Sequence, residues 1–163
     1  MLRLSKLTDY GIVLLAHLAA QDDRRSRNAR EMAEAAHLPL PVVSKLLKRL
    51  AREGLLVSQR GARGGYSLAR APEELTVAEA IGALEGPIAL TECGTADGRC
   101  PQEATCHVRD PWQQINQVLR EALEGLTLRD LVRSRDARII PLSELGIRKD
   151  AEPGEGAEHV RLR

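Results

Sequence analysis

The chain of 163 residues carries 24 lysines and arginines against 23 aspartates and glutamates, and this near balance conceals two halves of opposite charge. Residues 1–70 hold 13 basic against 6 acidic side chains, and residues 71–163 hold 11 against 17, so the net charges are +7 and −6. A basic half is typical of a protein that binds nucleic-acid phosphates, although a solvated charged face gives the same count. No apolar run reaches the roughly 18 residues that span a bilayer, and the N-terminus lacks a signal-peptide pattern. We therefore expect a cytoplasmic protein.

The basic half has the pattern of a helix-turn-helix. Ser5 or Thr8 can cap a first helix, and the capping box Asn28-Ala-Arg-Glu31 begins a second, short one. Pro39 disfavours helical geometry at the residue before it, whereas Pro41 is tolerated in a first helical turn, so a tight turn separates the second helix from a third. The predicted helices cover residues 5–20, 29–36 and 41–53.

Two short strands, residues 55–59 and 66–69, flank a loop with three glycines and predict a hairpin wing after the third helix. The fold class expected is therefore mainly α with a small β-hairpin: a winged helix-turn-helix domain followed by a long dimerisation helix. An ordinary exposed hairpin is the alternative for this loop. The expected DNA contacts are base edges for Ser44 and Lys45, phosphates for Lys48, Arg49 and Arg52, the minor groove for Arg60 and Arg63, and further phosphates for Lys6 and Tyr10.

The second half predicts helices that pair with another copy of the chain. A capping box, Thr76-Val-Ala-Glu79, begins a helix that ends near Gly86, and Asp110-Pro-Trp-Gln113 is expected to cap the longest helix. Its apolar residues recur at helical spacing, and too little chain remains to cover them: Ile115, Val118, Leu119, Ala122 and Leu126. The expected organisation is a DNA-binding domain over 1–87, a cysteine-rich cluster-binding loop over 88–110, dimerisation helices over 111–133 and a mobile tail over 134–163.

All three cysteines of the chain lie within 14 residues, with the spacing C-x6-C-x5-C: Cys93, Cys100 and Cys106. An odd number of cysteines in a cytosolic chain argues against a disulfide framework. Thiolates are soft ligands that favour iron–sulfur clusters and zinc, and one irregular loop lets three of them converge. Three hypotheses remain open: an iron–sulfur cluster, a structural zinc without the usual C-x2-C knuckle, and a cluster-free thiol switch favoured by Arg99 and Arg109.

A cysteine-dependent enzyme is a different class of function. His107 directly follows Cys106, but catalytic partners normally lie far apart in the sequence, and no third orienting group is evident. The remaining histidines, His17, His37 and His159, fall on a helix face, in a turn and in the tail. We therefore expect no enzyme. The +7 charge and the wing equally disfavour an interaction module that binds no DNA.

Several segments together carry a family pattern: Leu4–Tyr10, Val43–Leu50, Arg60–Arg70, Glu85-Gly-Pro87 and the cysteine triplet. Over roughly residues 1–133 the chain resembles the Rrf-type family of bacterial winged-helix regulators, which includes the iron–sulfur regulator IscR, the nitric-oxide sensor NsrR and the iron regulator RirA. The resemblance implies a homodimeric transcriptional repressor that binds promoter DNA and holds a 2Fe–2S or 4Fe–4S cluster. It would sense iron–sulfur status, oxidative stress or nitric oxide. The opening segment is most similar to members that control the SUF cluster-assembly operon.

By this resemblance, the fourth cluster ligand is a histidine shortly after the third cysteine or an N-terminal aspartate of the other subunit. Three residues past Cys106 this chain has Arg109, which cannot ligate iron, so it departs from the IscR pattern. Asp9, His107 and Glu92 remain as candidates. Asp9 from the partner subunit is preferred over His107, because adjacent residues rarely aim at one metal.

Overall fold

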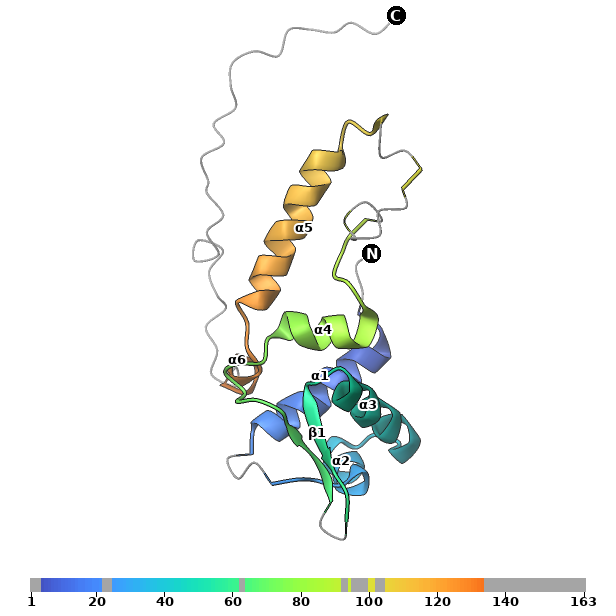
Figure 1. Ribbon diagram of the computed structural model, residues 1–163, viewed down its shortest axis with the longest axis vertical. Helices are drawn as coiled ribbons and strands as arrows, with labels where there is room; N and C mark the ends of the chain where they lie inside the picture. Colours follow the sequence, from blue (N-terminus) through green and yellow to red (C-terminus); the bar gives the residue numbers. More distant parts are fainter. Residues whose placement is uncertain are drawn as a thin grey trace, which may run out of the picture.

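The computed structural model describes residues 4–21, 25–61, 64–91, 94, 100–101 and 105–133. This part of the chain forms helices and one antiparallel pair of strands, which confirms the predicted fold class (Figure 1). In chain order the elements are α1 (Lys6–Ala19), α2 (Ala29–Ala36), α3 (Leu40–Arg52), β1 (Leu56–Gln59), β2 (Gly65–Leu68), α4 (Val77–Glu85), α5 (Arg109–Glu124) and α6 (Leu128–Arg133). Among the described residues, no helix is long and apolar enough to cross a membrane. The tail expected over 134–163 lies outside them.

Side-chain caps begin the helices at the residues that the sequence indicates. Ser5, rather than Thr8, caps α1, because its hydroxyl accepts the Thr8 backbone N–H at 3.2 Å. The predicted capping box of α2 forms, with the Asn28 side chain 3.0 Å from the backbone N–H of Glu31 and the Glu31 carboxylate 3.0 Å from that of Asn28. The second predicted box forms at the start of α4. Local capping chemistry thus sets these three boundaries.

The turn between α2 and α3 sets the start of the third helix. That helix begins and ends one residue earlier than predicted. His37 ends α2 with a left-handed φ of 53°. Pro39 is the N-cap of α3, so the helix begins at Leu40 with Pro41 in its first turn, where a missing N–H has no partner to lose. Gly54 follows the helix with φ 79°.

The wing is anchored by a backbone segment outside the hairpin. β1 and β2 pair with Gln59 opposite Gly65. The backbone of Arg27, before α2, exchanges two hydrogen bonds with Tyr66 at 2.9 and 2.8 Å, so β2 is paired on both edges. A Cβ on Gly65 would lie 2.5 Å from the Arg27 carbonyl oxygen, so the glycine allows these two backbones to approach closely.

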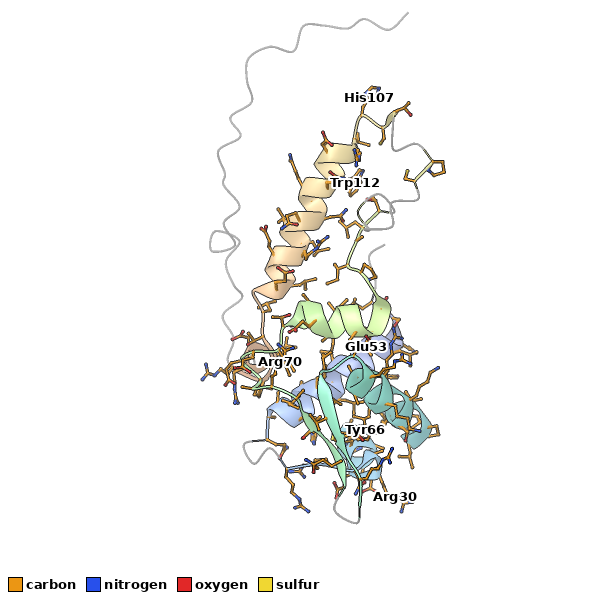
Figure 2. The ribbon with its side chains drawn as sticks, viewed as in Figure 1. Arg30, Glu53, Tyr66, Arg70, His107 and Trp112 are labelled. Atoms are coloured by element: carbon orange, nitrogen blue, oxygen red, sulfur yellow. The ribbon has the colours of Figure 1, made fainter. Side chains whose placement is uncertain are left out.

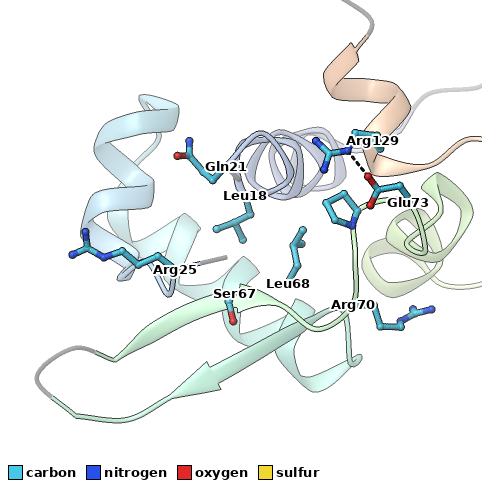
Figure 3. Close-up of a pocket in the computed structure, with 9 residues that line it drawn as sticks. Leu18, Gln21, Arg25, Ser67, Leu68, Arg70, Glu73 and Arg129 are labelled. Carbon is cyan, nitrogen blue, oxygen red and sulfur yellow. Dashed lines mark hydrogen bonds and ion pairs between the residues drawn. The ribbon is translucent and has the colours of Figure 1, made fainter. Parts of the chain in front are cut away.

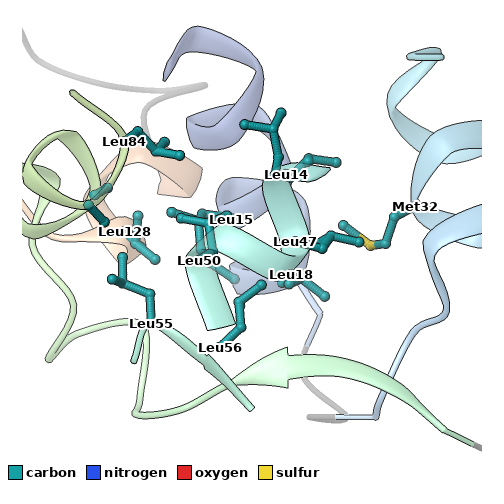
Figure 4. Packing of buried hydrophobic residues seen from close by; sticks show 14 of the residues in the cluster. Leu14, Leu15, Leu18, Met32, Leu47, Leu50, Leu55, Leu56, Leu84 and Leu128 are labelled. Atoms are coloured by element: carbon teal, nitrogen blue, oxygen red, sulfur yellow. The ribbon is translucent and has the colours of Figure 1, made fainter. Parts of the chain in front are cut away.

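A core of aliphatic side chains surrounds α1 (Figure 4), in a chain that has no Phe, one Trp and two Tyr. A Cβ at Gly11 would overlap the Leu84 side chain, so glycine brings α1 and α4 into close contact. Tyr10 and Tyr66 pack at the edge of the core. The largest fully buried aliphatic side chains are Leu14, Leu15, Met32, Val43, Leu47, Leu50, Leu75 and Leu128.

Helix α5 projects from this core, and the chain at its C-terminal end is hydrogen-bonded to the N-terminal end of α4 (Figure 1). The backbone N–H of Val77 donates to Leu126 at 2.8 Å, and that of Leu128 donates to Leu75 at 2.8 Å. The predicted start of α5, after a cap at Asp110, was two residues late, and the cap was wrong. The N-cap is Val108, without a side-chain hydrogen bond, and Asp110 lies in the first turn, where a carboxylate complements the helix dipole.

Candidate DNA-binding surface and cysteine segment

The outward face of α3 carries the basic side chains expected to meet DNA. The opposite face buries Val43, Leu46, Leu47 and Leu50, and this fixes which residues point to solvent. Lys45, Lys48 and Arg52 are exposed, and Ser44 is half-buried near the N-terminal end of the helix. These four side chains therefore form one polar and basic surface along α3.

Arg49, for which a phosphate contact is expected, is hydrogen-bonded to another helix of the same domain. Its Nε donates to the backbone carbonyl of Ala83 at 2.9 Å, and the side chain is half-buried. The reason is its place on the flank of α3 that faces α4, where a carbonyl near the end of the helix accepts its hydrogen bond. Arg49 thus connects the recognition helix to the helix that precedes the cysteines.

At the wing, Arg60 is exposed directly after β1, and Arg63 lies outside the described residues. Arg30, on α2, is also exposed, and Figure 2 places it at the same end of the molecule as the hairpin. Arg30 was not among the expected DNA contacts; the α2 capping box predicts that it begins a helix, but not that this helix lies near the wing. Ser26 donates its hydroxyl to the Gln59 amide oxygen at 2.9 Å and fastens the connector to β1.

The N-terminal end of α1 is held by Glu85, a residue at the end of α4. One Glu85 carboxylate oxygen accepts the Ser5 backbone N–H at 2.6 Å and the Thr8 hydroxyl at 2.7 Å. These hydrogen bonds, that of Thr8 first, lower the pKa of Glu85. Asp9, the candidate cluster ligand, is exposed one residue beyond Thr8. The sequence offered one signal for this contact, the Glu85-Gly-Pro87 motif.

Two further residues of α1 were expected to contact phosphate. Lys6 is exposed and free of the core, in keeping with that expectation. Tyr10 is half-buried and packs against the core, so only part of its side chain faces outward.

The cysteine segment connects α4 to α5. Cys100 and Cys106 are free thiols, both half-buried, and His107 is exposed at the far end of α5 (Figure 2). Cys93 and Glu92 lie outside the described residues. Within the described part of the chain, no three His, Cys, Asp or Glu side chains gather closely enough to hold a metal ion.

A pocket of about 270 Å³ lies away from α3, where α1, β2 and α6 meet (Figure 3). Two of its arginines form ion pairs: Arg129 bonds Glu73 at 2.7 Å, and Arg70 bonds Glu79 at 2.6 Å. The hydrogen bond from Arg129 lowers the pKa of Glu73. These ion pairs fasten α6 and α4 to the segment after the wing. The pocket is therefore a gap between packed elements and not part of the DNA-binding surface.

A helix-turn-helix, a paired wing and an exposed basic helix face define a winged-helix DNA-binding protein. A family model, Rrf2, described as an iron-dependent transcriptional regulator, matches residues 4–134. The chain belongs to this family of transcriptional regulators, which are not enzymes. The family resemblance predicted from the sequence is therefore confirmed.

Individual relatives agree with the family. Protein rrf2 of Nitratidesulfovibrio vulgaris is 29% identical over 146 residues, which cover 90% of this chain and 96% of that protein. The solved structure of CymR, the global cysteine regulator of B. subtilis, is 30% identical with a TM-score of 0.65, covering 82% of this chain and 98% of CymR. The structure of T. potens IscR is 27% identical with a TM-score of 0.63, and the match covers 82% of this chain and 88% of the IscR chain.

Proposed function

We propose that this regulator is a homodimeric repressor of iron–sulfur cluster assembly genes of the SUF type, and that its affinity for DNA depends on a cluster held by Cys93, Cys100 and Cys106. The observation that carries the proposal is the cysteine triplet between α4 and α5, in a chain that matches a family of iron-dependent regulators. Free, half-buried Cys100 and Cys106 support it, because partly enclosed thiols are accessible to a metal and shielded from bulk solvent.

The donor set fits an iron–sulfur cluster. Three thiolates are the soft ligands that such clusters require, and a bound cluster would supply a group sensitive to iron supply, oxidants and nitric oxide. Two features beside the segment also suit a sulfur-rich group. Gly94, which follows Cys93 in the sequence, leaves no room for a Cβ against Asn116, and Asn116 offers there a buried N–H donor that has no partner among the described residues.

For the fourth ligand we propose Asp9 from the partner subunit, with His107 as the alternative. Asp9 is exposed at the first turn of α1, so it is available to a second copy. It also lies beside the Ser5–Thr8–Glu85 contact, and Arg49 joins the same helix α4 to α3. Ligation by Asp9 would therefore bias the position of α1 and, through α4, the recognition helix.

On DNA, we propose that α3 enters the major groove and the wing approaches the minor groove. Two recognition helices of a dimer must reach half-sites about 34 Å apart, so a small change in dimer geometry alters affinity. Ser44 and Lys45 would read base edges, and Lys48, Arg52 and Lys6 would contact phosphates. Arg60 and Arg63 would serve the minor groove.

The test of the cofactor is anaerobic purification of the full chain, with visible absorption and with iron, sulfide and zinc measured per subunit. We expect a coloured protein with inorganic sulfide, bleached by Cys100→Ala, whose affinity for a SUF promoter fragment changes when the cluster is removed. Asp9→Ala should weaken cluster retention, whereas Glu34→Ala, at an exposed carboxylate of α2, should not. A colourless protein with stoichiometric zinc, or with no metal, would overturn the cluster sensor in favour of a zinc-stabilised or thiol-switched regulator.

The test of the DNA-binding surface compares two lysines of α3. Lys48→Ala should weaken binding to all sequences alike and lower the slope of log affinity against log salt by about 1. Lys45→Ala should instead alter base preference by about 1–3 kcal/mol at one operator position. Arg133→Ala, at an exposed arginine of α6, is the matched control and should change neither property. Equal effects of all three variants would contradict this assignment.

A further inference from the structure

Asn116 is the one buried residue of α5, a helix whose sixteen residues all lie in the described part of the chain. It is 2% exposed, whereas Ile115 and Gln117 on either side are exposed. A buried amide in a helix whose other residues are exposed or half-buried needs a reason, because burying a polar side chain is unfavourable unless its hydrogen bonds are satisfied.

The oxygen of the Asn116 amide has a hydrogen-bond partner. Its Oδ1 accepts the Leu90 backbone N–H at 2.7 Å, and so fastens the chain between α4 and the cysteines to α5. This hydrogen bond also fixes the orientation of the amide. The Leu90 N–H can only donate, so the oxygen must face Leu90 and the NH₂ group must face the other way.

The nitrogen of the amide lacks a hydrogen-bond partner in the described part of the chain. Nδ2 is buried and has no hydrogen-bond partner among the described residues. An unpaired buried donor costs about 1–3 kcal/mol, so such groups call for an explanation. A Cβ at Gly94 would overlap Nδ2 and lie 2.8 Å from Cγ, so the donor packs directly against the residue that follows Cys93 in the sequence. The free N–H groups are thus directed at the cysteine segment.

We propose that Asn116 is a positioning residue for the metal site, and that its Nδ2 donates an N–H···S hydrogen bond to a thiolate or sulfide sulfur when the cluster is bound. This inference rests on the proposed function. Hydrogen bonds to the sulfurs of a cluster stabilise its more negative, reduced form and therefore raise its reduction potential. Asn116 would also link the cluster to the helix expected to form the dimer, since the same side chain holds Leu90 against α5.

The test uses the full chain, reconstituted anaerobically, with the variant Asn116→Asp. This substitution keeps an oxygen for the Leu90 N–H and replaces the donor by an acceptor. We expect the variant to lose iron to EDTA about 10- to 100-fold faster than the wild type, and to show a lower midpoint potential in a redox titration. Gln114→Glu makes the same chemical change at an exposed position of α5 and should alter neither value.

Gly94→Ala provides a second variant that leaves the amide intact, in case Asn116→Asp fails to fold. The added methyl group would displace the Asn116 side chain, so we expect the same faster iron loss and lower potential. An unchanged potential and iron-loss rate in the folded variants would show that Asn116 serves packing alone and would overturn this inference, with the cluster sensor intact. A wild-type protein without iron and sulfide would overturn both proposals.

Discussion

At the residue scale, Glu85 joins two helices through a single oxygen atom. It accepts hydrogen bonds from the Ser5 backbone and the Thr8 hydroxyl, so the end of α4 holds the start of α1. Both hydrogen bonds favour the ionised carboxylate and lower the pKa of Glu85. The contact between α4 and α1 is therefore sensitive to acid.

The pH dependence of this contact follows from the direction of the shift. Because folding lowers the pKa of Glu85, its contribution is complete above the ordinary pKa of a glutamate and is lost as the pH falls through the lowered value. We expect Glu85→Gln, which keeps the acceptor oxygen and removes the charge, to lower the free energy of unfolding at neutral pH by ~0.5 kcal/mol, since solvent screens this exposed group. The difference from the wild type should shrink as the pH falls below the ordinary pKa of a glutamate and vanish once the pH lies below the lowered pKa of Glu85.

Urea unfolding of both proteins at neutral, mildly acidic and strongly acidic pH would measure this difference. Glu34→Gln, at an exposed carboxylate of α2, is the control and should follow the wild type throughout. A stability difference that stays constant with pH would mean that the shape of the Glu85 side chain matters and its charge does not.

The sequence predicted on which helix face some residues lie, but not the hydrogen bonds that others make, for a physical reason. Lys45 and Lys48 could be assigned to the outer face of α3, because the buried leucines of the same helix fix its orientation. Arg49 and Asn116 could not, because their partners, Ala83 and Leu90, lie 34 and 26 residues away in the chain. The periodicity of apolar residues predicts which face of a helix is buried. It does not predict which distant backbone atom a side chain of that helix contacts.

At the element scale, the wing depends on its contact with the connector before α2. Arg27 and Tyr66 pair their backbones, and Gly65 has no side chain to keep them apart. The hairpin is thus the outer part of a three-segment arrangement, which is more stable than two isolated strands. This anchoring fixes the direction in which the wing and Arg60 point.

Gly65→Ala should break that anchoring. The new methyl group would meet backbone atoms, which cannot rotate away as a side chain can, so we expect a loss of about 1–3 kcal/mol in the free energy of unfolding. Binding to operator DNA should weaken as well. Urea denaturation and fluorescence anisotropy with labelled DNA would measure both effects. Gly82→Ala is the control: nothing lies near its Cβ, so stability should stay equal or rise by up to about 1 kcal/mol.

Element boundaries were predictable wherever a local signal sets them. The Asn28 and Thr76 capping boxes depend on neighbouring residues alone, and both formed as predicted. The Gly-rich hairpin also formed, although both strands begin one residue away from the predicted starts. The start of α5 was wrong because Asp110-Pro111 looks like a cap followed by a first helical residue, yet the helix begins two residues earlier, at Arg109. The third backbone segment of the wing also escaped prediction, since pairing between distant segments leaves no short-range pattern.

At the scale of the whole molecule, α5 presents apolar side chains that the rest of the described chain does not cover. Ile115 is 47% exposed and Val118 45% exposed. A groove of about 330 Å³, lined mainly by apolar residues of α4, α5 and the segment after α4, lies at the foot of the helix. This surface supports the proposal that a second copy pairs along α5, because exposed apolar stripes of this kind mark contact sites.

A double variant, Ile115→Glu with Val118→Glu, should therefore convert the protein to a monomer in sedimentation or light-scattering measurements. Its affinity for an operator with two half-sites should fall by a factor of about 100 or more, because the two recognition helices no longer bind as one unit. Affinity for a single half-site should change little. Gln114→Glu, on the same helix, should remain dimeric. A monomeric wild-type chain would contradict the dimer proposal directly.

The bridge between Thr76 and Thr127 makes α5 a lever with its pivot beside the winged helix. Sixteen residues at about 1.5 Å each give an arm of about 24 Å, with the cysteine segment at the long end. A tilt of about 5° moves that end by roughly 2 Å. Under the proposed function, a displacement at the cysteines would reach α4 and the helices packed against it as a small rotation with a larger force.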